Sequence, residues 1–176
     1  MIGRSEGFEA PFQYTLPAGW TLGGDGERFF GFDGPGSADL MALSSVVPAR
    51  SDCSDRPKPG VGTSSDAMTS WLARHPALDA TAPVDVTLGA ARGSWVDVQL
   101  EDEWEQSCPG GLVLVTGRPD GEESWEIHAN EKIRFYVLDV PSGDTVTIVM
   151  GTTSPGEFAE LSEKATPVVE SFEFIG

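Results

Sequence analysis

The alternation of apolar and polar positions is clearest in the stretch between residues 111 and 151. Four strand-like runs follow one another there, at 111–117, 123–129, 131–140 and 144–151. The segments between the runs are only a few residues long, and such short connections favour antiparallel neighbours because parallel strands need long crossovers. The pattern therefore predicts that the four strands pair in chain order as an antiparallel meander.

The third of these runs carries apolar side chains on both of its faces. With a period of two, the odd positions from Ile133 to Val137 point to one side, and the even positions from Tyr136 to Val140 point to the other. A strand with two apolar faces is typical of the middle of a sheet that is covered on both sides. We therefore expect a covering layer on each face.

Helical spacing near the end of the chain predicts one of these covering layers. From Ser154 onward, apolar residues recur at steps of three or four, as in a helix with one buried face. We expect Phe158 and Leu161 of this helix to pack on one face of the sheet. Pro167 interrupts the pattern, which predicts a kink or an early end of the helix, and residues 171–174 fit a terminal strand.

The first part of the chain shows several shorter strands, one loop and one helix. The expected strands lie within 8–20 and at 27–32, 38–47, 83–88 and 91–101. Residues 48–65 are rich in Pro, Ser and charge, which predicts a loop. The helix that follows is expected to be capped by Ser65 or Asp66 and to stop at Pro76. His75 ends this helix, where the helix dipole favours a positive charge.

These elements predict an α+β fold in which helices flank an antiparallel sheet. The length suits one domain with a full core, and we place it at residues 8–176. Residues 1–7 are expected to be a disordered N-terminal segment or one added for expression.

The chain has two cysteines, Cys53 and Cys108, and both lie in polar segments typical of loops. The stretch EDEWEQSCPGG, residues 101–111, places carboxylates directly before Cys108, and these disfavour a reactive thiolate. Neither cysteine has a neighbour at the spacing of a zinc site. The pair therefore predicts a disulfide, which is typical of an oxidising, extracytoplasmic compartment. A reactive thiol and a metal-binding pair are the alternatives.

Four acidic residues near the cysteines are weak candidates for a cation site: Asp52, Asp55, Glu101 and Asp102. Consecutive side chains of an extended segment point in alternate directions, so the acidic run before Cys108 does not converge by itself. A cation site here requires the disulfide to bring both loops together. We expect a solvated strand end without a metal or other cofactor, and a cation-binding accessory module is the alternative.

Four other residues are candidates for a binding site. Trp95 and Asp97 share one side of their strand, and that side fits either a core tryptophan or the wall of a ligand groove. Trp104 and His128 complete the set. A hydrolase that uses His128 with a serine and an acid is an alternative, although no motif of a nucleophile elbow, phosphate loop or metalloprotease accompanies it. We predict no catalytic residues.

The net charge limits the partners. The chain has 28 acidic against 11 basic residues and a formal net charge of −17. A surface of this sign repels phosphate backbones and anionic lipids, which argues against nucleic acid as a partner. No run approaches the roughly 20 apolar residues of a membrane span, so we expect no membrane insertion of this segment. The partner that remains to be expected is an unknown protein or a small ligand.

Four segments carry a resemblance to a known family. They are FQYTLPAGW near the start, WLARHPALDATAPVDVTLGAARGSWVDVQL in the middle, then FYVLDVPSGDTVTIVM, and ATPVVESFEF at the end. Together they resemble exported bacterial domains with the PsbP-like fold, which is shared by lumenal photosystem II proteins and by mycobacterial envelope lipoproteins of the LpqN type. Gly89-Ala90 stands where the family often has two glycines, a departure that affects only the turn.

The resemblance implies a PsbP-like α/β/α sandwich, an antiparallel sheet between helices, in a protein outside the cytoplasm. It implies binding or accessory roles, and it brings no catalytic residues to this chain. We therefore expect a non-enzymatic extracytoplasmic domain for binding, sensing or an accessory role. The parent is expected to be an exported lipoprotein or a membrane protein whose signal peptide or anchor lies outside this sequence.

Overall fold

The computed structural model describes residues 1–35, 38–101, 104, 108, 110–117 and 124–175. Its helices are α1 (Ser65–Leu72), the short 3₁₀ turn η1 (Pro155–Glu157) and α3 (Phe158–Glu170). Its strands are β1 (Ile2–Arg4), β2 (Phe12–Thr15), β3 (Thr21–Asp25), β4 (Phe29–Asp33), β5 (Asp39–Ser44), β6 (Val46–Pro48), β7 (Leu78–Ala80), β8 (Val84–Leu88), β9 (Ala91–Leu100), β10 (Leu112–Gly117), β11 (Ser124–Ile127), β12 (Lys132–Asp139), β13 (Thr145–Thr152) and β14 (Glu173–Phe174).

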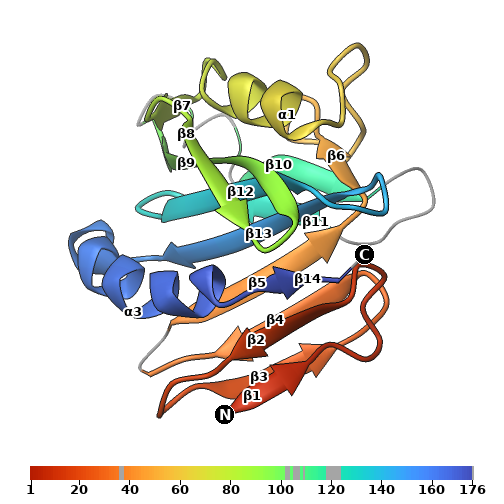
Figure 1. The fold of residues 1–176 in the computed structure, drawn as a ribbon. Coiled ribbons are helices and arrows are strands. Elements are labelled where there is room, and N and C mark those ends of the chain that lie inside the picture. Colours follow the sequence, from red (N-terminus) through yellow and green to blue (C-terminus); the bar gives the residue numbers. More distant parts are fainter. Residues whose placement is uncertain (36–37, 102–103, 105–107, 109, 118–123, 176) are drawn as a thin grey trace.

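An eight-stranded antiparallel sheet forms the centre of the fold (Figure 1). Its strand order is β3-β4-β5-β13-β12-β9-β7, and β8 also pairs with β9. The outer edge of β9 is shared, because β8 pairs with its first half and β7 with its last three residues. The α+β class and the antiparallel sheet are confirmed.

Each face of this sheet is covered by one helix and one three-stranded sheet. On one face lie α3 and the sheet β1-β2-β14, which bury a cluster of aromatic and aliphatic side chains that includes Phe12, Phe30 and Phe172. On the other face lie α1 and the sheet β11-β10-β6, around Met68 and Leu114. The two helices therefore lie on opposite sides of the central sheet (Figure 1).

The two apolar faces of β12 are divided between these cores as predicted. Ile133, Phe135 and Val137 belong to the core under α1, whereas Tyr136 and Leu138 belong to the core under α3. The predicted packing of the late helix is also confirmed, because Phe158 and Leu161 are buried in the same core as Tyr136.

The predicted meander is wrong at its middle step. The hairpins β10–β11 and β12–β13 form, but within the described residues β11 does not pair with β12. Instead, β12 pairs with β9 over eight positions. The reason is that Val96 and Val98 of β9 continue the apolar face of β12. Strand β10 is buried along its whole length and becomes part of a covering layer instead.

Three local expectations are corrected as well. The cap of α1 is Ser64 rather than Ser65 or Asp66, because the Ser65 hydroxyl donates to the buried Val137 carbonyl at 2.6 Å. Helix α3 passes through Pro167 and ends at Glu170, since one missing N–H near the last turn is offset by buried neighbours. Residues 2–4 form β1 against β2, so this part of the N-terminal segment is ordered.

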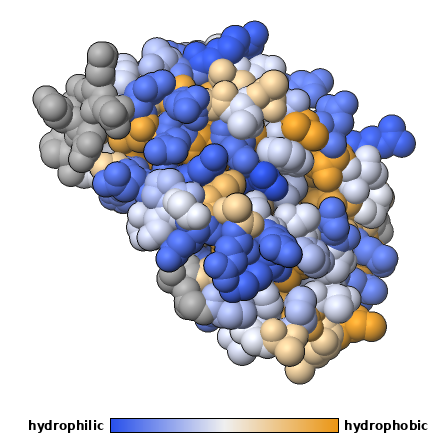
Figure 2. Space-filling view, turned by 90° about the vertical axis from the view of Figure 1, so that its left-hand side faces the viewer, coloured by the Kyte–Doolittle hydropathy of each residue, from blue (hydrophilic) through white to orange (hydrophobic). Residues whose placement is uncertain are grey.

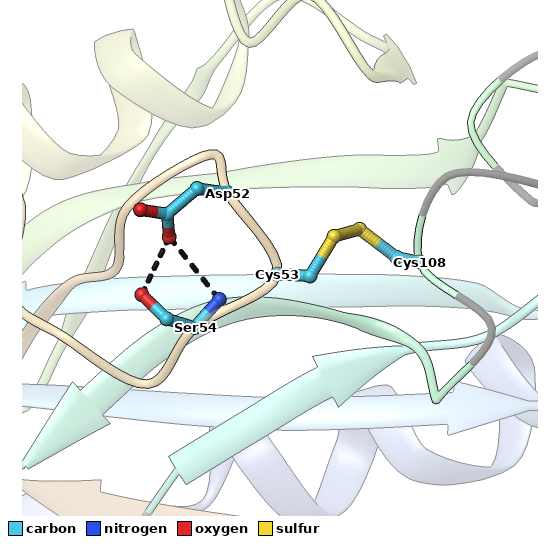
Figure 3. Close-up of a disulfide and its surroundings, with 4 residues drawn as sticks. All are labelled: Asp52, Cys53, Ser54 and Cys108. Carbon is cyan, nitrogen blue, oxygen red and sulfur yellow. Dashed lines mark hydrogen bonds between the residues drawn. A yellow bond between two sulfur atoms is a disulfide. The ribbon is translucent and has the colours of Figure 1, made fainter.

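The Cys53–Cys108 disulfide is confirmed (Figure 3). Its Cα atoms lie 5.6 Å apart and it closes a loop of 55 residues. Cys108 is buried in the core under α1, and Cys53 lies in the exposed loop between β6 and α1. The bridge therefore fastens this loop to the body of the domain.

We expect loss of the disulfide to lower the free energy of unfolding by about 4 kcal/mol, because the unfolded chain regains the entropy of a 55-residue loop. The variant is Cys53→Ser with Cys108→Ala, since alanine avoids a buried hydroxyl. Urea denaturation of this variant and of oxidised wild type measures the difference. A loss of under about 1 kcal/mol would show that the loop is already constrained without the bridge.

Candidate binding groove beside helix α1

Trp95 and Asp97 join with Arg134 in a closed cluster on the α3 side of the sheet. Arg134 Nε donates to Asp97 Oδ1 at 2.6 Å, and Nη2 donates to Oδ2 at 2.9 Å. The guanidinium carbon lies 3.8 Å from the centroid of a Trp95 ring. The Arg134 and Asp97 side chains are only 14% and 10% exposed. Because protein groups satisfy one another here, the cluster fastens β9 to β12, and the interpretation of Trp95 as a structural residue is favoured over a groove wall.

Trp104 and His128 belong to the opposite face of the central sheet. Trp104 packs, half-buried, against the core that contains Cys108. His128 directly follows β11 and is exposed, with Nε2 3.1 Å from Glu126 Oε1. The only side chain that contacts this ring by a hydrogen bond in the described residues is therefore a carboxylate and not a serine. The four candidates are divided by the central sheet and do not form one site.

The acidic candidates near the disulfide are occupied or dispersed. Asp52 accepts hydrogen bonds from the Ser54 hydroxyl at 2.5 Å and from the Ser54 N–H at 3.2 Å, which holds the pKa of Asp52 below its usual value (Figure 3). Among the residues that the structure describes, no three His, Cys, Asp or Glu side chains gather in a position to hold a metal. Asp102 lies outside the described residues.

A groove of about 620 Å³ lies between α1 and the loop that precedes it. One wall is formed by Lys58 and residues 60–62. The other is formed by Ala67 and Trp71 of α1 and by Arg74, which follows the end of the helix. His75 and Pro76 also line it. We call this depression the α1 groove, and its volume is within the usual range for small-molecule sites.

The loop wall of the α1 groove is anchored at its base. Ala49 and Pro57 form a β-bridge, and the backbone N–H groups of Arg50 and Lys58 donate to Arg56 and Pro48 carbonyls, both at 2.8 Å. The disulfide at Cys53 holds the tip of this small hairpin against the domain (Figure 3). The position of Lys58 is therefore set by backbone contacts and by the disulfide.

His75 lines the groove as a neutral, buried imidazole. The residue is 4% exposed, and the edge of its ring meets Trp71 with 5.0 Å between the centroids. Burial, with a further contribution from the charge of Lys58, lowers the pKa of His75 to about 4. Nδ1 accepts the Ala77 N–H at 3.2 Å, which places the proton of the neutral ring on Nε2. The expectation of a cation at this helix end is therefore wrong, because α1 already ends at Leu72 and burial disfavours the charged form of the His75 ring.

The charge of the sequence segment that forms the groove differs from that of the whole chain. Residues 48–77 contain four Lys and Arg and three Asp, a net of +1, against −17 for the chain. In the part of the chain that the structure describes, the ion pairs involve Arg134, Lys164 and His128, and none involves Lys58 or Arg74. This local excess of basic residues is the sequence signal that could have identified the groove.

A second depression lies beside α3, and it is smaller than the α1 groove. Figure 2 shows the molecule from the left-hand side of Figure 1, where one end of α3 lies, and hydrophilic side chains occupy much of the centre of that view. A depression of about 190 Å³ beside α3 is lined in part by Glu157, Glu160 and Lys164. Its lysine already pairs with Glu160 at 2.6 Å. The α1 groove is therefore the stronger candidate.

Comparison with known proteins gives matches in fold only. No family model and no curated protein sequence matches the chain. Similar solved structures include LpqN of Mycobacterium tuberculosis, involved in cell envelope biogenesis, with 11% identity, a TM-score of 0.49, and coverage of 94% of this chain and 83% of LpqN. PsbP (CyanoP) of Synechocystis sp. PCC 6803 has 13% identity and a TM-score of 0.43, with 99% and 92% covered.

A third structure is a protein of Bacteroides thetaiotaomicron VPI-5482, with 11% identity and a TM-score of 0.47. The match covers 94% of this chain, which spans 45% of the length of the Bacteroides protein. LpqN and PsbP are the two kinds of protein that the sequence motifs resemble. The likeness concerns the fold alone.

We expect His75 to make the stability of the fold depend on pH. Between its ordinary pKa of 6.5 and about 4, the unfolded chain binds a proton at His75 and the folded protein does not. The contribution is therefore fully present above pH 6.5 and is lost as the pH falls toward 4. Urea unfolding between about pH 7.5 and pH 5, above the ordinary carboxyl range, measures it.

The variant His75→Gln should lose less stability over this interval than wild type, and the matched variant His128→Gln should follow wild type. Equal pH slopes for wild type and His75→Gln would contradict a buried neutral imidazole.

Proposed function

We propose that this chain is a non-enzymatic binding domain of an exported protein and that the α1 groove is its ligand site. The observation that carries the proposal is the groove itself, about 620 Å³ in volume, with one wall held in place by the disulfide. A preformed wall lowers the entropy that a ligand must overcome on binding.

The disulfide also supports a location outside the cytoplasm. Structural disulfides persist in oxidising compartments and are rare where cellular thiols are kept reduced. The Cys53–Cys108 bridge holds the loop that forms one wall of the proposed site, so reduction would affect both the fold and the groove. An exported lipoprotein or the outer part of a membrane protein is the parent that we propose.

The composition of the groove supports binding rather than turnover. Half-buried Trp71 and Val61 provide apolar surface, and Lys58 and Arg74 provide exposed charge. The single imidazole in the groove has a pKa of about 4, which makes it a poor general base near neutral pH. A mostly apolar depression with a few polar groups is typical of a ligand site.

Nuclear magnetic resonance titration of the ¹⁵N-labelled protein with a panel of neutral, cationic and anionic aromatic fragments tests the proposal. At least one fragment should cause saturable shifts confined to the amides of residues 58–62 and 67–75. The variant Val61→Glu, which places a carboxylate in the wall, should weaken that fragment about fivefold or more through lost apolar contact and added charge.

The matched control is Val84→Glu, since Val84 is exposed on β8 and does not line the groove. Its affinity should equal that of wild type. The proposal would be overturned if no fragment shifted the groove amides, or if both glutamate variants weakened binding alike.

A further inference from the structure

The α1 groove brings two unpaired cationic side chains to one depression. Lys58 comes from the loop before α1 and Arg74 comes from the segment just after α1, so two different segments supply an ammonium and a guanidinium group to the same groove. Both residues are exposed, and the ion pairs of the described residues leave both without a carboxylate partner. A ligand that carries negative charge would satisfy both.

The imidazole of His75 adds to the same preference. Its Nε2 carries the proton, and no protein atom in the described part of the chain accepts it. An N–H without an acceptor contributes a partial positive charge beside the groove. Because the ring is neutral, Lys58 and Arg74 carry the formal charges among the described residues that line the groove. Trp71 and Val61 add apolar surface to the same groove.

The large negative charge of the chain does not cancel this local preference. At physiological ionic strength the Debye length is about 8 Å, so exposed acidic residues farther away are largely screened. They still act on large charged surfaces, because a bilayer or a nucleic acid contacts many of them at once. A small molecule that enters the groove meets Lys58 and Arg74, and no carboxylate is among the described residues that line it.

We infer that the ligand of the α1 groove is a small soluble organic anion, in which a phosphate or carboxylate group is attached to an apolar or aromatic body. Lys58 and Arg74 hold the anionic group, and the ring of Trp71 with the Val61 side chain contacts the body. This inference rests on the proposed function and specifies the chemistry of the same site.

The test uses phenyl phosphate, benzoate and the neutral benzyl alcohol in titrations of the intact, disulfide-bonded protein. Phenyl phosphate should bind more tightly than benzoate, and benzyl alcohol should bind at least about tenfold more weakly than phenyl phosphate. Lys58→Gln and Arg74→Gln should each weaken phenyl phosphate about threefold, the effect of one exposed charge pair, and leave benzyl alcohol unchanged. Raising the salt concentration should weaken phenyl phosphate only.

Arg4→Gln is the matched control, because Arg4 is exposed on β1, in the layer on the other side of the central sheet from α1. It should bind phenyl phosphate as wild type does. Equal effects of Arg4→Gln and Arg74→Gln would overturn the inference, because the whole-chain charge would then decide affinity.

Three further outcomes separate this inference from the proposed function. If benzyl alcohol shifts the groove amides as strongly as phenyl phosphate and neither glutamine variant matters, the groove binds ligands but the anion inference is wrong. If the protein sediments with phosphatidylglycerol vesicles and this sedimentation depends on Lys58 and Arg74, the ligand is a bilayer headgroup. The inference of a soluble anion is then overturned. Absence of any groove response to the whole fragment panel contradicts the proposed function itself.

Discussion

Strand β12 buries apolar side chains on both of its faces, and the rest of the domain is arranged to cover them. Phe135 and Val137 require a layer on one side and Tyr136 and Leu138 a layer on the other, because exposed side chains of this size forfeit about 1.5–3 kcal/mol each. Helix α1 is part of one layer. Its N-terminus is fastened to β12 by the Ser65 hydroxyl, which donates to Val137 O. The position of the groove beside α1 therefore follows from the sheet.

The disulfide connects this packing to the proposed function. The loop from Ala49 to Gly62 has little apolar surface of its own, and its residues are mostly exposed. Backbone contacts hold it at its base, including the bridge between Ala49 and Pro57 and the Ala49 N–H that donates to Leu114 O, and the bond from Cys53 joins it to the buried Cys108. Lys58 follows the bridge directly and lines the groove together with Arg74. A covalent bond thus positions a polar loop where burial alone supplies little energy.

The sequence predicted those features that depend on local periodicity or on a single pair of residues. The two faces of β12, the burial of Phe158 and the Cys53–Cys108 bond were all evident in this way. The pairing of β12 with β9 was missed, since it depends on packing between segments about 40 residues apart, and adjacency along the chain favoured β11. The groove was missed for a different reason: the loop and the helix that form it are adjacent in the chain, but the depression between them depends on how the disulfide and the backbone contacts place the loop. The neutral state of His75 likewise depends on tertiary burial.

Nuclear magnetic resonance of the imidazole nitrogens tests the central claim most directly, because the chain has only two histidines, His75 and His128, and His128→Gln assigns both. The claim is that a neutral His75 with its proton on Nε2 lies in an anion-binding groove. Near pH 7 the His75 ring should show the neutral Nε2-protonated tautomer, and phenyl phosphate should shift its resonances while those of His128 stay fixed. A charged or Nδ1-protonated His75, or a ring that does not respond while His128 does, would contradict the account.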